Sequence, residues 1–176
     1  MSPEHVHVVV VHLPIVGLMA ALIPLAWAVL RRDRTSAALG LTIAAAFALV
    51  TPIAAYSGEE AEERLEHASG PLALDAGGER WMEEHEERAE VGAVVLYVAT
   101  AVLVVGLLVL LRRAEDPAWT RALAAGGVAT CVVSLLLLGW VANAGGMIRH
   151  PELRGETGGV TGGLVPLVGE RHEHDD

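Results

Sequence analysis

The sequence has no lysine, a single cysteine and few aromatic residues. All 12 basic residues are arginines, and 22 acidic residues bring the formal net charge to −10. Nucleic-acid binding requires a basic surface, so this balance argues against a nucleic-acid partner. The lone Cys131 leaves no disulfide to form within the chain. Apolar residues instead make up 53% of the 176 residues, and they come in long blocks that exclude a soluble globular domain.

Four of these blocks are long enough to cross a lipid bilayer. They cover about residues 6–30, 37–56, 91–111 and 122–141, and no arginine or carboxylate lies within them. A bilayer core of about 30 Å needs roughly 20 helical residues, because lipid offers the backbone no other partners. The sequence therefore predicts an all-α, integral membrane four-helix bundle over residues 1–154. A flexible, acidic, histidine-containing tail is expected at residues 155–176.

The charges of the connections predict the orientation. Arginines fill both short connections: Arg31, Arg32 and Arg34 in the first, and Arg112, Arg113 and Arg121 in the last. The long connection between the second and third blocks is acidic instead. Because arginine-rich loops stay in the cytoplasm, both termini and the acidic connection should face outward. For a bacterium, this means a multi-pass inner-membrane protein with periplasmic N- and C-termini.

Glycines and prolines predict where helices bend or end. Pro14, Pro24 and Pro52 lie within the apolar blocks and should bend them or free a carbonyl group. Asp75-Ala-Gly-Gly is expected to form a turn, and Gly145-Gly146 is expected to end the fourth helix. Helix formers from Glu59 onward should extend the second helix beyond the membrane, and the run from Glu79 should enter the third helix unbroken.

On this topology all eight histidines lie on the outer side. They are His5, His7, His12, His67, His85, His150, His172 and His174. His12 lies about one turn inside an apolar block, where an imidazole must face the bundle or find another partner. His12 is therefore either a ligand or proton-relay residue, or a histidine hydrogen-bonded to a neighbouring helix or to water.

Carboxylates accompany these histidines. Glu63 and His67 are four residues apart on one helix face, Glu60 lies nearby, and Glu86 follows His85. Histidine and glutamate on facing helices form carboxylate-bridged metal sites in other bundles. Imidazole also suits zinc, copper and haem iron. The alternative is an acidic helix surface that is simply solvated.

Four segments carry a family resemblance, and one of them is Ser57-Gly-Glu-Glu-Ala after the second apolar block. The first helix begins His5-Val-His7-Val-Val-Val-Val-His12-Leu-Pro-Ile, the third begins His85-Glu-Glu-Arg-Ala, and the closing segment reads Gly145-Gly-Met-Ile-Arg-His-Pro-Glu. Over about residues 4–154 the chain resembles a family of uncharacterised bacterial four-span membrane proteins, a domain of unknown function with V-H-x-P-I, H-E-x-x-A and G-G-x-I-R-H-P-E motifs. The motif histidines map onto His7, His12, His85 and His150. Related domains are similar to membrane parts of redox systems, which implies a haem or metal role.

The leading hypothesis is a redox or metal-binding protein with its centre at the outer end of the bundle. The expected ligands are His12 and His85, then His150 or His67, with His7 as a further candidate for a cofactor and with Glu60, Glu63 and Glu86 as further ligands or hydrogen-bond partners. The cofactor would be haem b or a transition metal (iron, copper or zinc), and electrons would pass to a respiratory or periplasmic redox partner. The alternatives are a cofactor-free accessory subunit of a larger membrane complex and a periplasmic metal or pH sensor. Nothing in the sequence indicates an enzyme acting on its own.

Overall fold

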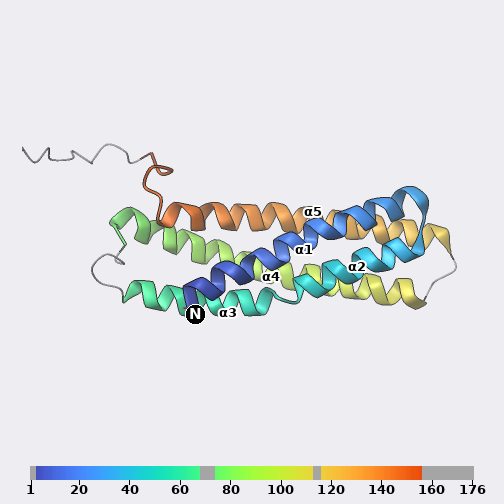
Figure 1. Cartoon of the computed structure of the whole chain (residues 1–176), viewed down its shortest axis with the longest axis horizontal. Coiled ribbons are helices and arrows are strands. Elements are labelled where there is room, and N and C mark those ends of the chain that lie inside the picture. Colours follow the sequence, from blue (N-terminus) through green and yellow to red (C-terminus); the bar gives the residue numbers. More distant parts are fainter. Residues whose placement is uncertain (1–2, 68–73, 113–115, 156–176) are drawn as a thin grey trace, which may run out of the picture.

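Four long helical rods lie side by side in the structure (Figure 1). The computed structural model describes residues 3–67, 74–112 and 116–155. The helices are α1 (Pro3–Arg31), α2 (Arg34–Ala48), α3 (Thr51–Glu66), α4 (Ala76–Arg112) and α5 (Pro117–Ile148). Since α2 and α3 together form one rod, the predicted all-α four-helix bundle is confirmed. The predicted tail lies outside the described residues from residue 156 onward.

The rods alternate in direction around the bundle. α1 packs on α5 and on the rod of α2 and α3, and α4 packs on the same two neighbours from the opposite corner. α1 and α4 therefore lie diagonally across from each other. We call one end the histidine end, where α1 and α4 begin and α3 and α5 finish (Figure 1). The opposite end is the arginine end, where Arg31, Arg32, Arg34, Arg112 and Arg121 lie.

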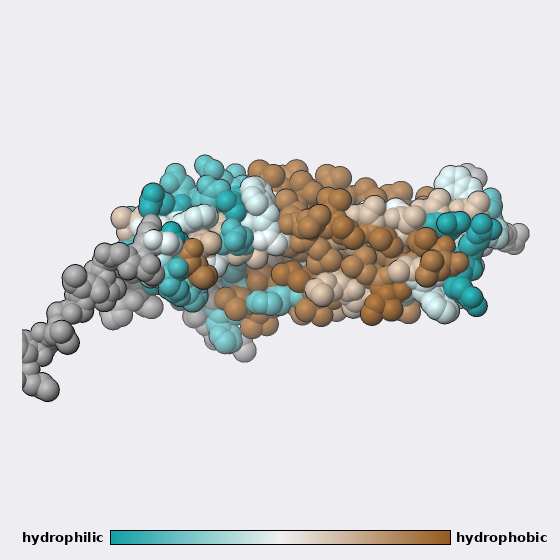
Figure 2. Space-filling view, turned by 90° about the horizontal axis from the view of Figure 1, so that it is seen from above, coloured by the Kyte–Doolittle hydropathy of each residue, from teal (hydrophilic) through white to brown (hydrophobic). Residues whose placement is uncertain are grey.

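Each rod is long and apolar enough to cross a membrane. The candidate spans are His5–Arg31, Arg34–Leu65, Ala76–Arg112 and Pro117–Ile148. Figure 2 shows a wide apolar belt between two hydrophilic ends. Large apolar side chains on this belt are exposed, Ile23 at 76% and Leu136 at 71%. A water-soluble protein rarely exposes such a surface, so the fold is that of a multi-pass membrane protein.

The second rod is interrupted where a proline was expected to disturb it. α2 ends at Ala48, whose carbonyl accepts a hydrogen bond from the Thr51 hydroxyl at 2.7 Å. Pro52 lies in the first turn of α3, where its missing N–H costs nothing. Pro14 and Pro24, in contrast, lie within an unbroken α1. As predicted, α3 continues into the acidic region and α4 runs through to the third span without a break.

Two glycine pairs do not end or turn the chain as predicted. Gly77 and Gly78 belong to the first turn of α4, and Gly145-Gly146 lies inside α5. The reason is close approach between helices. A Cβ atom on Gly78 would lie 2.8 Å from the Ile148 carbonyl oxygen, and one on Gly145 would lie 3.1 Å from the His85 ring. These glycines therefore make room for a neighbouring group instead of freeing the backbone.

Small residues bring the helices together in the apolar belt, as expected for packing in lipid. A Cβ atom on Gly17 of α1 would lie 2.1 Å from Cγ of Phe47 in α2. A Cβ on Gly40 would lie 2.6 Å from Leu25, and Cys131 is fully buried in the core. The first two rods thus interlock at Gly17 and Gly40.

Replacing Gly17 with alanine should destabilise the bundle by about 1–3 kcal/mol, the usual range for overpacking. The new Cβ would also lie 2.2 Å from Cβ of Phe47, an atom that moves only with the α2 backbone. Thermal unfolding of the purified protein in detergent measures the loss. Gly126→Ala is the matched control because nothing lies within 4 Å of its Cβ position. An unchanged unfolding temperature for Gly17→Ala would contradict the close packing.

Candidate functional site

His7 reaches from α1 to the neighbouring α3. Its Nδ1 lies 3.1 Å from the Ala54 carbonyl oxygen and 3.4 Å from Oγ of Ser57. The Ser57 hydroxyl donates to the same carbonyl at 3.0 Å. The ring covers Gly58, where a Cβ atom would lie 3.0 Å from Cε1 of the imidazole. α3 therefore offers His7 an acceptor and, one turn later, a residue small enough to lie beneath the ring.

His85 has the same arrangement between α4 and α5. Its Nδ1 lies 3.1 Å from the Val141 carbonyl oxygen. Four residues further along α5, Gly145 lies against the ring, with 3.1 Å between its Cβ position and Cε1. In both cases, then, a histidine near the start of one helix pairs with a carbonyl and a glycine on the next helix.

These hydrogen bonds determine which nitrogen of each ring carries the proton. A carbonyl oxygen only accepts hydrogen bonds, so Nδ1 must be the protonated donor in His7 and His85. In a neutral ring the lone pair is then on Nε2. Within the described part of the chain, neither Nε2 atom makes a hydrogen bond. Each ring is thus held in place with a free ligating atom.

The two rings belong to one end of the bundle. They come from the first turns of α1 and α4, the diagonal pair. Both side chains are partly buried. The structure therefore places His7 and His85 at the same end of the bundle, and His85 was one of the two first-choice ligands.

The other first-choice ligand, His12, lies elsewhere. Its side chain is exposed, and its Nδ1 bonds to the Val8 carbonyl one turn earlier in α1. His12 lies five positions after His7 in α1, so its ring points to a different side of the helix from that of His7, and its convergence with His85 stays a prediction. Depth in the apolar block was readable from the sequence, whereas the direction of the ring was not.

The remaining predicted residues do not gather around this pair. His67 is exposed at the end of α3, where its Nδ1 bonds to the Glu63 carbonyl at 2.7 Å. The Glu60 carboxylate accepts a bond from the Tyr56 hydroxyl at 2.9 Å, and Glu86 is exposed. His150 is exposed as well, and its Nδ1 lies 2.7 Å from the carboxylate of the exposed Glu152, two residues later. No group of three or more histidine, cysteine or acidic residues that could hold a metal ion occurs among residues 3–67, 74–112 and 116–155.

The sequence reading missed a partly buried arginine near His85. The Arg88 guanidinium lies 4.9 Å from the ring centroid of Trp140 and 5.8 Å from that of Trp81. It also donates to the Trp140 carbonyl at 3.0 Å and to the Glu84 carboxylate at 2.8 Å. These contacts join α4 to α5 one turn beyond His85. Trp81 and Trp140 are the sequence signal for this cluster, because arginine often packs over tryptophan rings.

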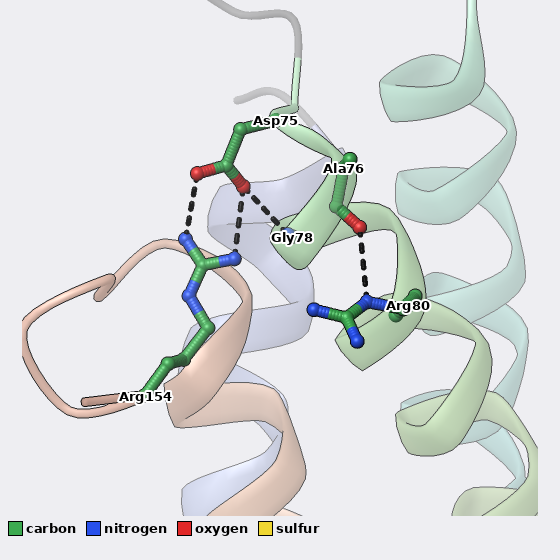
Figure 3. A network of polar contacts seen from close by, with 5 residues as sticks. All are labelled: Asp75, Ala76, Gly78, Arg80 and Arg154. Carbon is green, nitrogen blue, oxygen red and sulfur yellow. Dashed lines mark hydrogen bonds and ion pairs between the residues drawn. The ribbon is translucent and has the colours of Figure 1, made fainter. Parts of the chain in front are cut away.

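At the histidine end, a second ion pair joins the residue before α4 to the turn that follows α5 (Figure 3). Arg154, in the turn that follows α5, donates through its two terminal nitrogens to the two Asp75 carboxylate oxygens, each at 2.9 Å. Asp75 also accepts a bond from the Gly78 N–H at 2.6 Å and so caps α4. Only 2% of the Arg154 side chain is exposed. We call this pair the clasp.

Comparison with protein-family models, curated proteins and solved structures finds no match for the chain. The resemblance to a four-span family therefore stays a prediction that rests on the motifs. The geometry of His7 and His85 carries the functional argument by itself.

The clasp should open in acid. Hydrogen bonds from Arg154 and from the Gly78 N–H lower the pKa of Asp75 below its usual value. A depressed pKa contributes stability that is complete above the unfolded pKa, near 4, and is lost as the pH falls through the folded pKa. Hydrogen exchange of residues 149–155, corrected for intrinsic rate, should therefore accelerate below about pH 4.

Asp75→Asn is the matched variant for this measurement. Asparagine keeps an oxygen for the Gly78 N–H but removes the charge. In this variant, residues 149–155 should exchange rapidly already at neutral pH. The acceleration below about pH 4 that protonation of Asp75 causes should be absent. The pKa of Glu152 is also lowered, by its bond to His150, so the difference between the two proteins isolates Asp75. Identical profiles would show that the ion pair does not hold the turn.

The proton positions in the two rings are open to a direct test. In the protein prepared without any added cofactor, ¹⁵N NMR of histidine-labelled samples should show the Nδ1–H tautomer for His7 and His85. His7→Gln and His85→Gln assign the two signals. An Nε2–H tautomer in either ring would contradict the hydrogen bonds to Ala54 and Val141.

Proposed function

We propose that this chain is a membrane haem b protein, in which His7 and His85 would hold the haem iron at the histidine end of the bundle. The observation that supports the proposal is the matched pair of imidazoles from diagonal helices. Each donates through Nδ1 to a carbonyl of its neighbouring helix and retains the lone pair of Nε2.

The number of available ligands favours haem over a bare metal ion. A structural zinc site uses four protein ligands, and a catalytic one uses three. Two partly buried imidazoles, from α1 and α4, keep Nε2 available at this end, and the described residues contain no group of three metal-binding side chains. Haem iron needs at most two protein ligands, because the macrocycle supplies the other four. A mixed site of histidine and carboxylate, built with Glu60, Glu63 or Glu86, does not fit this arrangement.

The surroundings of the rings also suit axial ligation. Ligating histidines usually donate their second ring nitrogen to a carbonyl or carboxylate, which fixes the ring orientation and makes the ligand more basic. Ala54 and Val141 supply these carbonyls. Gly58 and Gly145 let each ring approach the neighbouring helix closely, which limits rotation of the ring.

Bound haem would supply a one-electron couple at one face of the membrane. The chain itself holds the two imidazoles, and Arg88 adds a positive charge one turn from His85. We infer that the protein passes electrons to a respiratory or periplasmic redox partner. Because the arginine-rich connections favour the cytoplasm, we place the histidine end and both termini at the periplasmic face of a bacterial inner membrane.

A cofactor-free accessory subunit is the competing function. In that case the bonds from His7 and His85 would serve only to join helices, as polar contacts between membrane helices commonly do. The same contacts support both functions, so the experiment must separate ligation from packing.

The test is haem binding by the purified full chain in detergent. The protein as isolated, or after titration with hemin, should bind about one haem and give the low-spin spectrum of bis-imidazole ligation, in both oxidation states. His7→Ala and His85→Ala should each remove that spectrum. Thermal unfolding and circular dichroism of the two variants show whether the helical fold survives.

Two exposed histidines provide the controls. His12→Ala and His67→Ala remove imidazoles that bond only to carbonyls of their own helices, so both variants should keep the spectrum. If the wild-type chain binds no haem under either condition, the accessory-subunit function is favoured. A spectrum that survives in both His7→Ala and His85→Ala would refute the ligand assignment.

A further inference from the structure

A groove with two arginines opens at the arginine end of the bundle. It has a volume of about 430 Å³ and is lined by Arg32, Ala118, Arg121, Ala122 and Ala125. Arg32 belongs to the turn between α1 and α2, and the other four residues belong to the first turns of α5. Both charged residues of the lining are therefore cations, from segments far apart in the sequence.

Arg32 occupies a backbone conformation that arginine rarely adopts. Its φ is 56°, and its N–H donates to the Ala28 carbonyl at 2.8 Å, which closes the last turn of α1. Helices usually place glycine at this left-handed position, because a Cβ atom is strained there. Glycine would form this turn without strain. We therefore expect the arginine side chain to have a function that the turn itself does not require.

The two guanidinium groups of the groove have no partner in the described part of the chain. Arg31 lies over the ring of Trp27, with 5.4 Å to the centroid, and Arg34 donates to the Leu111 carbonyl at 3.3 Å. Arg32 and Arg121, by contrast, make no side-chain hydrogen bond, ion pair or ring contact within residues 3–67, 74–112 and 116–155.

The carboxylates that cap helices at this end are already engaged. Asp33 accepts a bond from the Ser36 N–H at 2.8 Å and Asp116 accepts one from the Ala118 N–H at 2.8 Å. Each therefore caps the start of a helix, α2 and α5 respectively. Both carboxylates thus bond to backbone N–H groups, and these bonds do not involve the Arg32 or Arg121 side chains.

We infer that this groove binds the phosphate headgroup of an anionic phospholipid. Guanidinium groups bind phosphate through paired hydrogen bonds, and two of them face one groove here. The first turn of a 32-residue helix adds the positive end of its dipole. Basic pockets between membrane helices recognise anionic headgroups on the cytoplasmic side, where we place this end.

The apolar part of the lining favours a lipid over a soluble anion. Three of the five lining residues are alanines on α5, and they lie in the first turns of its candidate membrane span, Pro117–Ile148. In this proposal the lipid phosphate would lie between the arginines, and its glycerol and acyl chains would continue along the apolar span that begins at Pro117. Inorganic phosphate would leave the alanine wall without a partner. This inference does not depend on haem binding.

Native mass spectrometry of the full chain tests the proposal. The detergent-solubilised protein is titrated with dioleoyl-phosphatidylglycerol or, separately, with dioleoyl-phosphatidylcholine. The wild-type chain should retain phosphatidylglycerol selectively. Arg32→Gly and Arg121→Gln should each weaken retention, and the double variant should weaken it by about tenfold or more. Arg112→Gln is the matched control, because Arg112 lies at the same end but outside the groove lining.

Arg32→Gly also separates binding from folding. Glycine adopts a φ of 56° without strain, so this variant should unfold at the same or a higher temperature while losing lipid affinity. Equal retention of the two lipids by the wild type would overturn the proposal. So would an equal loss in Arg112→Gln, or displacement of the lipid by millimolar inorganic phosphate, which would assign the groove to a soluble anion.

Discussion

The histidine end depends on the bond between an imidazole N–H and a carbonyl of the neighbouring helix. Near the membrane core, a polar ring that enters a helix bundle must find a partner inside the protein. His7 and His85 meet this demand through Nδ1, and the partners are carbonyls that already accept helical bonds. Once Nδ1 is used in this way, the position of the proton, the plane of the ring and the availability of Nε2 all follow. The glycines at residues 58 and 145 are needed only because the rings must come this close.

The same device occurs once in each half of the chain. The first helical hairpin consists of α1 with the rod of α2 and α3, and the second consists of α4 with α5. In each hairpin, a histidine of the first helix bonds to a carbonyl on the second, four residues before the glycine beneath the ring. Two hairpins that run alternately up and down place their first helices on a diagonal. The correspondence between the halves therefore places two imidazoles with the same hydrogen-bond pattern at one end of the bundle.

The sequence predicted the rods because span length and apolar content are properties of the chain alone. It located the acidic helical extensions for the same reason, since no proline follows Glu79 until the arginine end. The direction of a side chain around a helix depends instead on which helix packs beside it. His12 was chosen for its depth and faces outward, whereas His7 was a weaker candidate and faces a neighbour. Gly78 and Gly145 were read as turn residues because a glycine needed for backbone freedom looks identical in sequence to one needed for close packing.

The clasp makes the two hairpins unequal. Asp75 and Arg154 tie the beginning of α4 to the turn that follows α5, and Arg88 joins the same two helices again between two tryptophans. Among adjacent elements, α3 and α4 make the least contact with each other. The second hairpin is therefore fastened at the histidine end by two arginines, whereas α3 and α4 are held together by fewer contacts. If this end of the bundle opens, α3 should separate from α4 while α4 and α5 remain joined.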